Sequence, residues 1–187
     1  MPEPSVKGLL LDFPRTAVRE ALEQGRLTQE QLELRLDARS LEIVDRKPEP
    51  SLWYPITCHE ALVTLADELN NTGGSDVARD RGREVMTRLL QAEHLNRIVC
   101  EARRRGERAG SLVIALPRML MNFGDWKTSG GLDDLVVEAS DVAPLHEPMR
   151  FGFEGSMEAL IEHLGGEKVE VWSDRPTPDT IVFRLHR

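Results

Sequence analysis

Cysteine is scarce in this sequence: the 187 residues include two, Cys58 and Cys100. Two cysteines without a C-x-x-C pair do not build a zinc site, and a chain of this length does not depend on a disulfide framework. Apolar stretches are far shorter than the roughly 20 residues that a transmembrane helix requires. No basic segment leads into an apolar run at the start, so no secretory signal is indicated. We therefore expect a cytoplasmic protein with reduced thiols, no metal site and no membrane contact.

Positive charge and aromatic side chains are also in short supply. The chain has 24 Lys and Arg against 32 Asp and Glu, a net charge of −8, and only 5% aromatic residues. Such a chain attracts no polyanion through its bulk charge, and no aromatic residue interrupts its one basic run, so we expect no nucleic-acid binding. We interpret that run as a solvated helix end, with docking of an acidic protein partner as the alternative. It consists of Arg103, Arg104, Arg105 and Arg108.

Familiar catalytic motifs are absent. There is no G-x-S-x-G nucleophile turn and no glycine-rich phosphate loop, and the pair His59-Glu60 has no second histidine four residues on. The paired glycines and clustered carboxylates are typical of turns and of a solvated surface. We therefore do not expect an enzyme.

Apolar periodicity predicts an α+β fold. Helices are expected from Pro55 to Leu69, from Ser75 onward and from Met157 to Leu164, and strands near 135–139, 169–172 and 181–185, with a long connection over 173–180. Residues 110–126 are compatible with a strand or a helix, and Pro117 favours the helix. The predicted architecture is an N-terminal and central helical layer packed on a small antiparallel C-terminal sheet, in the order strand, helix, strand, strand.

A single domain is expected over residues 1–187. Residues 1–50 are interpreted as an N-terminal helical annex, because the proline-rich segment 46–55 is typical of a linker. Within the annex, Thr28 and Gln31 have the spacing of a capping box and predict a helix start. A separate helix is predicted to begin at Thr16 and to end at Gly25.

Two groups of residues are candidates for a binding site. His59 lies on the apolar stripe of its predicted helix beside Cys58, so it could contact a ligand at the base of a cavity or be a hydrogen-bonded core histidine. His94 is a second candidate of the same kind. Aromatic residues flank two predicted helices and either close the helix ends over the core or line a pocket or partner groove. They are Trp53, Tyr54, Phe123 and Trp126.

A series of short motifs resembles a known group of proteins. The series is Lys7-Gly8, W-Y-P at 53–55, Arg81-Gly82-Arg83, N-F-G-D-W at 122–126, and F-x-F-E-G at 151–155 followed by a helix and a hairpin. Taken together it resembles an uncharacterised bacterial family that is distantly similar to haem-nitric-oxide-binding and 4-vinyl-reductase-like ligand-sensing domains. The resemblance spans most of the chain and implies a small-molecule cavity between a helical layer and an antiparallel sheet. The haem-binding members carry a Y-x-S-x-R motif for the haem propionates, which this sequence lacks, so we expect no haem and no other cofactor.

The favoured hypothesis is a non-enzymatic regulatory or sensory module that holds a small apolar ligand. The expected lining comes from the 56–69 helix, the 110–126 segment and the C-terminal sheet. The alternative is a protein-interaction adaptor without a ligand that docks through its aromatics and the Arg103–Arg108 edge. Both hypotheses are compatible with a homodimer. The predicted ligand-binding residues are His59, Cys58, Trp53, Tyr54, Phe123 and Trp126.

Overall fold

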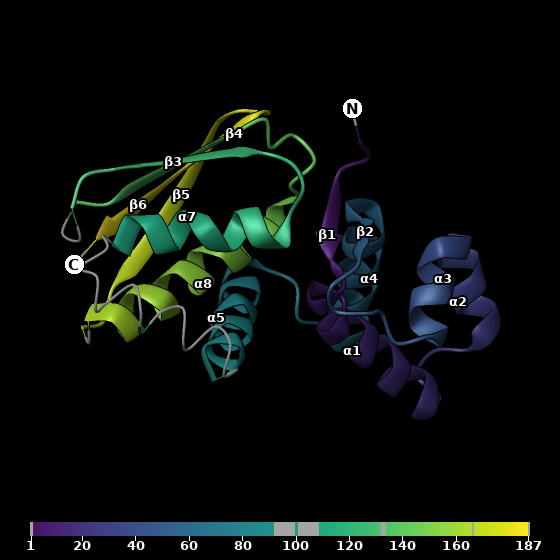
Figure 1. Ribbon diagram of the computed structural model, residues 1–187. Coiled ribbons are helices and arrows are strands. Elements are labelled where there is room, and N and C mark those ends of the chain that lie inside the picture. The colour runs from purple at the N-terminus through teal and green to yellow at the C-terminus, as the bar shows by residue number, and fades with distance from the viewer. Residues whose placement is uncertain (1, 92–99, 101–108, 132–133, 166, 187) are drawn as a thin grey trace. The chain divides into compact units, whose positions relative to one another are not determined.

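A computed structural model describes residues 2–91, 100, 109–131, 134–165 and 167–186 (Figure 1). The chain divides into two compact units, which are described separately. The first comprises Met1–Gly73 with Leu120–Asn122, and the second comprises Gly74–Met119 with Phe123–Arg187. The proline-rich segment 46–55 lies inside the first unit, and the assignment of residues 1–187 to a single domain stays a prediction.

The first unit is mainly helical, with one two-stranded antiparallel sheet. In that sheet Ser5 pairs with Pro55 and Lys7 with Trp53. The segment Leu120–Asn122 joins it through a bridge between Val6 and Met121, and the Ser5 N–H donates to Asn122 Oδ1 at 2.7 Å. The elements are β1 (Ser5–Lys7), η1 (Gly8–Leu10), α1 (Asp12–Glu23), α2 (Gln29–Arg35), α3 (Ala38–Asp45), β2 (Trp53–Pro55) and α4 (Ile56–Asn70).

Local signals account for most helix ends of the first unit. The predicted capping box is confirmed: the Gln31 N–H donates to Thr28 Oγ1 at 3.2 Å, and the Thr28 N–H donates to Gln31 Oε1 at 2.9 Å. Helix α1 begins at Asp12 rather than Thr16, because Pro14 is tolerated in a first helical turn. Helix α3 was not predicted, and Asp37 caps it by accepting from the Ser40 N–H at 2.7 Å.

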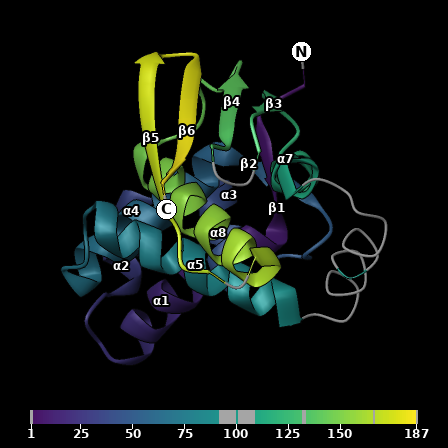
Figure 2. The same ribbon diagram turned by 90° about the vertical axis from the view of Figure 1, so that its left-hand side faces the viewer.

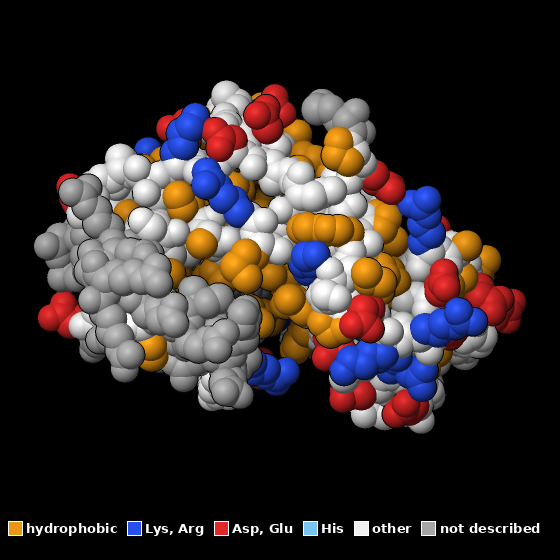
Figure 3. All heavy atoms as spheres, in the orientation of Figure 1, with side chains coloured by type: hydrophobic (Ala, Val, Ile, Leu, Met, Phe, Trp, Pro, Cys, Tyr) orange, Lys and Arg blue, Asp and Glu red, His pale blue; other side chains and the backbone are white. Residues whose placement is uncertain are grey.

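The helices of the first unit close over one apolar core. Side chains of α1, α2, α3 and α4 supply it, and Cys58 is part of it. The surface of this unit carries charged side chains of both signs in pairs, and Figure 3 shows them interspersed rather than gathered into a patch of one sign. The core consists of Leu11, Val18, Ala21, Leu27, Leu32, Leu36, Ile43, Val44, Cys58, Leu62, Leu65 and Ala66.

The second unit packs helices on a four-stranded antiparallel sheet, which confirms the α+β class. The strand order is β3-β4-β6-β5, and Figure 2 shows β5 and β6 side by side as a hairpin. The ambiguous segment 110–126 is helical over most of its length. The elements are α5 (Ser75–Gln91), α7 (Ala109–Leu120), β3 (Asp125–Ser129), β4 (Val136–Ser140), α8 (Glu147–Gly165), β5 (Glu170–Thr177) and β6 (Thr180–His186).

Three features of the second unit differ from the sequence predictions. Strand β3 was not predicted, because polar and charged residues predominate in its sequence and hide the alternation of buried and exposed side chains. Helix α8 begins at Glu147, well before Met157, since Pro148 occupies the first turn. The long connection over 173–180 is wrong: β5 continues to Thr177, with a register shift after Asp174 that accommodates Pro176 on an edge strand.

Helix α7 covers the β3 edge of the sheet. Arg118 Nη2 donates to the Trp126 carbonyl of β3 at 2.8 Å, and a Cβ on Gly110 would lie 3.0 Å from Thr128 Oγ1. The opposite edge, β5, is covered by side chains of α8 that are described below. Among the helices that the structure describes, none combines the length and the apolar character needed to cross a bilayer.

Candidate functional site

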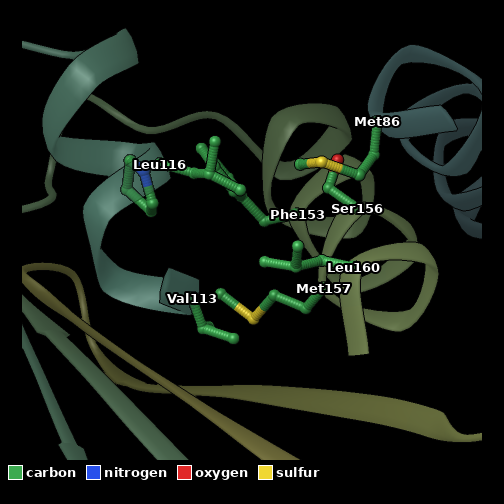
Figure 4. A pocket seen from close by; sticks show the side chains of 8 residues that line it. Met86, Val113, Leu116, Phe153, Ser156, Met157 and Leu160 are labelled. Atoms are coloured by element: carbon green, nitrogen blue, oxygen red, sulfur yellow. The ribbon is translucent and has the colours of Figure 1, made fainter. Parts of the chain in front are cut away.

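An apolar cavity lies between three helices of the second unit (Figure 4). Its volume is about 20 Å³, and Figure 4 shows side chains of α7 facing those of α8 across it. Ser156 supplies the one polar side chain of the lining, and its Oγ donates to the Gly82 carbonyl at 3.0 Å. The lining residues are Met86 of α5, Val113, Leu116 and Pro117 of α7, and Phe153, Ser156, Met157 and Leu160 of α8.

Three glutamates of α8, spaced four residues apart, cap the outer edge of β5. The backbone N–H groups of Ser173, Val171 and Val169 donate to them in turn. The N–H to Oε1 distances are 2.9 Å to Glu154, 3.0 Å to Glu158 and 3.2 Å to Glu162. An edge strand needs such partners, because its outward N–H groups would otherwise be left unpaired.

Two arginines of α5 form ion pairs with these three glutamates. Arg79 Nη2 lies 2.5 Å from Glu154 Oε2, and Arg83 lies 2.6 Å from both Glu158 and Glu162. Burial opposes the charged guanidinium of Arg79, but the hydrogen bond and charge of Glu154 and the charge of Glu158 outweigh it and raise the pKa of Arg79. Burial also opposes the charged form of Arg83, but the hydrogen bonds and charges of Glu162 and Glu158 outweigh it and raise the pKa of Arg83. We call these five side chains, Arg79, Arg83, Glu154, Glu158 and Glu162, the edge ladder.

Glycines allow α5 and α8 to approach closely enough for the edge ladder to form. A Cβ placed on Gly82 would lie 1.8 Å from the Gly152 carbonyl oxygen. One placed on Gly155 would lie 1.9 Å from the Arg79 carbonyl oxygen. Any side chain at either position would therefore force the two helix backbones apart.

His146 lies in the turn that leads into α8, beside Glu147 and Arg175. Arg175 donates to the Leu145 carbonyl and ion-pairs with Glu147 at 2.9 Å, which ties β5 to the start of α8. Burial lowers the pKa of His146 to about 4, the charge of Glu147 opposes that shift, and Arg175 adds to it. The imidazole is therefore neutral at physiological pH.

Cys58 and His59 are both buried in α4 of the first unit. Burial raises the pKa of the Cys58 thiol, which favours an inert core thiol over a nucleophile. His59 is 8% exposed, as its place on the apolar stripe predicted. A ligand role for either residue stays a prediction, and neither lines the cavity of the second unit.

The predicted aromatic residues have different environments. Trp126 is 0% exposed and packs against Phe153 and Phe183, with ring centroids 5.4 Å and 6.1 Å away. Trp53 is 45% exposed, with the Lys7 ammonium 3.8 Å from its ring centroid. Burial leaves Trp126 unavailable to a docking partner, because a fully enclosed side chain presents no surface.

The remaining predicted site residues that the structure describes, Tyr54 and Phe123, belong to different units. Tyr54 is partly buried and its hydroxyl accepts from the Glu49 N–H at 2.9 Å. Phe123 is partly buried in the second unit. His94 and the basic run Arg103, Arg104, Arg105 and Arg108 lie outside the described residues. A ligand-binding role for Trp53, Tyr54, Phe123 or Trp126 stays a prediction.

The edge ladder was not found from the sequence. A cavity was expected, and the 110–126 segment does line this one, but α5 and α8 complete the lining in place of the 56–69 helix and the sheet. The signal for the edge ladder was present: Arg79 and Arg83 are four residues apart, and Glu154, Glu158 and Glu162 repeat at the same spacing. Such spacing also occurs on solvated helix faces. Only the pairing of α5 with α8 shows that Glu154 and Glu158 are buried.

The fold is the one seen in solved H-NOX structures. It is similar to an Fe(II) unliganded H-NOX mutant from K. algicida, with a TM-score of 0.63, 9% identity, and coverage of 96% of this chain and 95% of that chain. For an S. oneidensis H-NOX protein in the Fe(II)NO ligation state the TM-score is 0.56 at 14% identity, over 96% of this chain and 98% of that chain. No protein-family model and no curated protein matches the sequence. The distant resemblance to haem-nitric-oxide-binding domains is therefore confirmed at the level of fold.

These neighbours contradict the prediction that the chain takes no cofactor. Two of them are Fe(II) proteins, and a third, at a TM-score of 0.57 and 12% identity, comes from work on heme distortion in the H-NOX family. The prediction relied on the missing Y-x-S-x-R motif. That motif accounts for contacts to the propionates alone, so its absence from the sequence is not sufficient to exclude a cofactor.

The cavity of the second unit does not fit a haem. It has room for about one water-sized molecule, and its lining contains no histidine, cysteine or tyrosine that could ligate iron. Of the histidines that the structure describes, His59 is the most buried, and it belongs to the first unit. The cavity between α5, α7 and α8 is therefore not a haem pocket.

Proposed function

We propose that this chain is a non-enzymatic regulatory domain that senses a small ligand. The observation that carries the proposal is the likeness to H-NOX structures, which extends over 96% of this chain and 95–98% of two of those neighbours. A likeness of that extent concerns a whole domain rather than one motif. Because those neighbours contain Fe(II), and NO in one case, haem is the first ligand to test.

The two buried carboxylates of the second unit, Glu154 and Glu158, are not available for catalysis. A general acid or base needs a carboxylate that can reach a substrate and change its protonation state. Glu154 and Glu158 are each 2% exposed, and their oxygens are occupied by β5 N–H groups and by the arginines of α5. They therefore hold structure and leave no reactive oxygen.

The test is a hemin titration of the purified chain, followed by native mass spectrometry. We expect a Soret band that saturates at one hemin per chain and a matching added mass. The proposal is contradicted if hemin gives no saturable band and the chain purified from cells carries no added mass. His59→Ala tests the predicted ligand role of His59, and His163→Ala, an exposed histidine of α8, is the matched control.

A further inference from the structure

Side chains supply the partners of the backbone groups on the outer edge of β5. The N–H groups of Val169, Val171 and Ser173 donate to the three glutamates of the edge ladder. Arg79 Nη2 donates to the Val171 carbonyl at 3.2 Å, and Arg150 Nη1 donates to the Ser173 carbonyl at 2.8 Å. These backbone groups therefore have the donors and acceptors that a neighbouring strand would otherwise provide.

The repeat of α8 matches the repeat of β5. Four residues of an α-helix rise about 6 Å, and two residues of an antiparallel strand extend about 6.8 Å. Glutamates at every fourth position of α8 therefore meet the outward N–H groups at every second position of β5. A row of carboxylates thus occupies the place of a further strand, next to the strand at which the sheet order ends.

The covered edge is complementary to a second copy of itself. In an antiparallel pair, opposed residues whose backbone groups point toward each other exchange two hydrogen bonds. The outward groups of β5 belong to Val169, Val171 and Ser173, which are symmetric about Val171. With Val171 opposite its own counterpart, Val169 lies opposite Ser173 in both directions. Pro176, which cannot donate, lies outside this register, and the exposed Trp172 lies within it.

Carboxylates are a costly cover for a strand edge. Glu154 and Glu158 are each 2% exposed, and removing a carboxylate from water carries a desolvation penalty that an apolar cover avoids. Three carboxylates in a row also repel the carbonyl groups of any strand that approaches the edge. Charge directed at an edge in this way is a means of preventing strands from pairing.

We propose that the outer edge of β5 is a latent dimerisation surface and that the edge ladder is the autoinhibitory contact that closes it. The occupant of the opened edge is β5 of a second copy of this chain, paired antiparallel about Val171. Release of the glutamates from the strand frees the N–H groups that such a pair requires. The surface belongs to the second unit, and the inference depends neither on haem nor on the sensing function proposed above.

Two substitutions of Glu158 separate this role from a simple loss of stability. Both remove the charge that pairs with Arg83, but Glu158→Gln keeps an acceptor for the Val171 N–H, whereas Glu158→Ala leaves it uncapped. In sedimentation velocity, we expect Glu158→Ala to reach twice the mass of the parent chain, reversibly, as the protein concentration rises. Glu158→Gln should have the parent mass at every concentration. Equal masses of the two variants, or a larger mass for Glu158→Gln, would overturn the proposal.

Amide hydrogen exchange identifies the surface that pairs. In Glu158→Ala, protection of the Val171 and Ser173 amides should rise with protein concentration, while that of Leu32 in α2 of the first unit stays constant. Doubling of mass without this protection contradicts pairing through β5. If Glu158→Ala does not fold, Glu162→Ala replaces it, because the Glu162 side chain is 24% exposed. A parent-like mass of that variant then overturns the proposal.

Discussion

The two units join their helices with different chemistry. In the first unit, α1, α3 and α4 meet through aliphatic side chains such as Val18, Val44 and Leu62, and its ion pairs lie on the surface. In the second unit, α5 meets α8 through glycine backbone and through the edge ladder, whose Glu154 and Glu158 are buried. Ion pairs therefore join the helices of the second unit, whereas those of the first unit lie on its surface.

This difference determines how each unit responds to substitution. In an aliphatic core the loss of stability depends gradually on the change in side-chain volume, because neighbouring side chains relax around the substitution. A backbone contact between helices cannot relax in that way, and a buried carboxylate cannot lose its partner without leaving a charge uncompensated. We therefore expect the largest single-residue effects in the second unit.

Gly82→Ala should have the largest effect. Its Cβ would lie 1.8 Å from the Gly152 carbonyl oxygen, so α5 and α8 must separate and the edge ladder must lengthen. We expect a loss of about 3 kcal/mol in the free energy of unfolding, measured by urea denaturation. Gly73→Ala is the control, because nothing lies within 4 Å of its Cβ position. Equal stability of the two variants would show that the helix contact is not tight.

Glu158→Gln should have the next largest effect. Glu158 lies 2.6 Å from Arg83 and 3.7 Å from Arg79 and accepts from the Val171 N–H, so the neutral variant keeps an acceptor but loses its ionic attraction to both arginines. We expect a loss of about 2 kcal/mol, below the range for fully buried pairs because Arg79 and Arg83 are partly exposed.

Glu84→Gln is the matched control for Glu158→Gln. Glu84 pairs with Arg88 on the exposed face of α5, the helix that carries Arg79 and Arg83. Exposed pairs of this type contribute about 0.5 kcal/mol or less. If both glutamine variants lose the same stability, the edge ladder behaves as a surface network and the contrast between the units disappears.

Acid should destabilise the second unit through His146. Its pKa is about 4 in the folded chain, against 6.5 for an ordinary histidine, so below pH 6.5 the unfolded chain binds a proton that the folded chain does not. Stability is therefore fully present above pH 6.5 and is lost as the pH falls toward 4. Between pH 7 and pH 5 we expect a loss of about 1–2 kcal/mol. Comparison of His146→Gln with the parent chain isolates this contribution, and parallel pH profiles would contradict it.

Features that depend on neighbours in the sequence could be predicted, and features that depend on distant partners could not. The capping box at Thr28, the helix over Ile56–Asn70 and the β5–β6 hairpin follow from local rules of capping and periodicity. The apolar stripe also predicted the burial of His59. These signals need no knowledge of what packs against them.

The edge ladder and the burial of Trp126 depend on tertiary pairing. Glu154 and Glu158 have the spacing of a solvated helix face, and nothing in that spacing identifies the β5 edge as their partner. Trp126 follows a short polar turn and has the sequence context of an exposed aromatic, yet its strand directs it between Phe153 and Phe183. The cofactor prediction failed similarly, since a missing short motif was given more weight than a fold.

Apart from the control variants, Thr28→Ala should have the smallest effect, and it tests the contribution of local capping in the first unit. It removes the hydroxyl that accepts from the Gln31 N–H at the start of α2, in an exposed part of the first unit. We expect a loss of about 1 kcal/mol or less in urea denaturation. Thr16→Ala is the control, because its hydroxyl only donates to the Asp12 carbonyl one turn back along α1. A Thr28→Ala loss equal to that of Glu158→Gln would mean that local capping supports the fold as strongly as the buried network does.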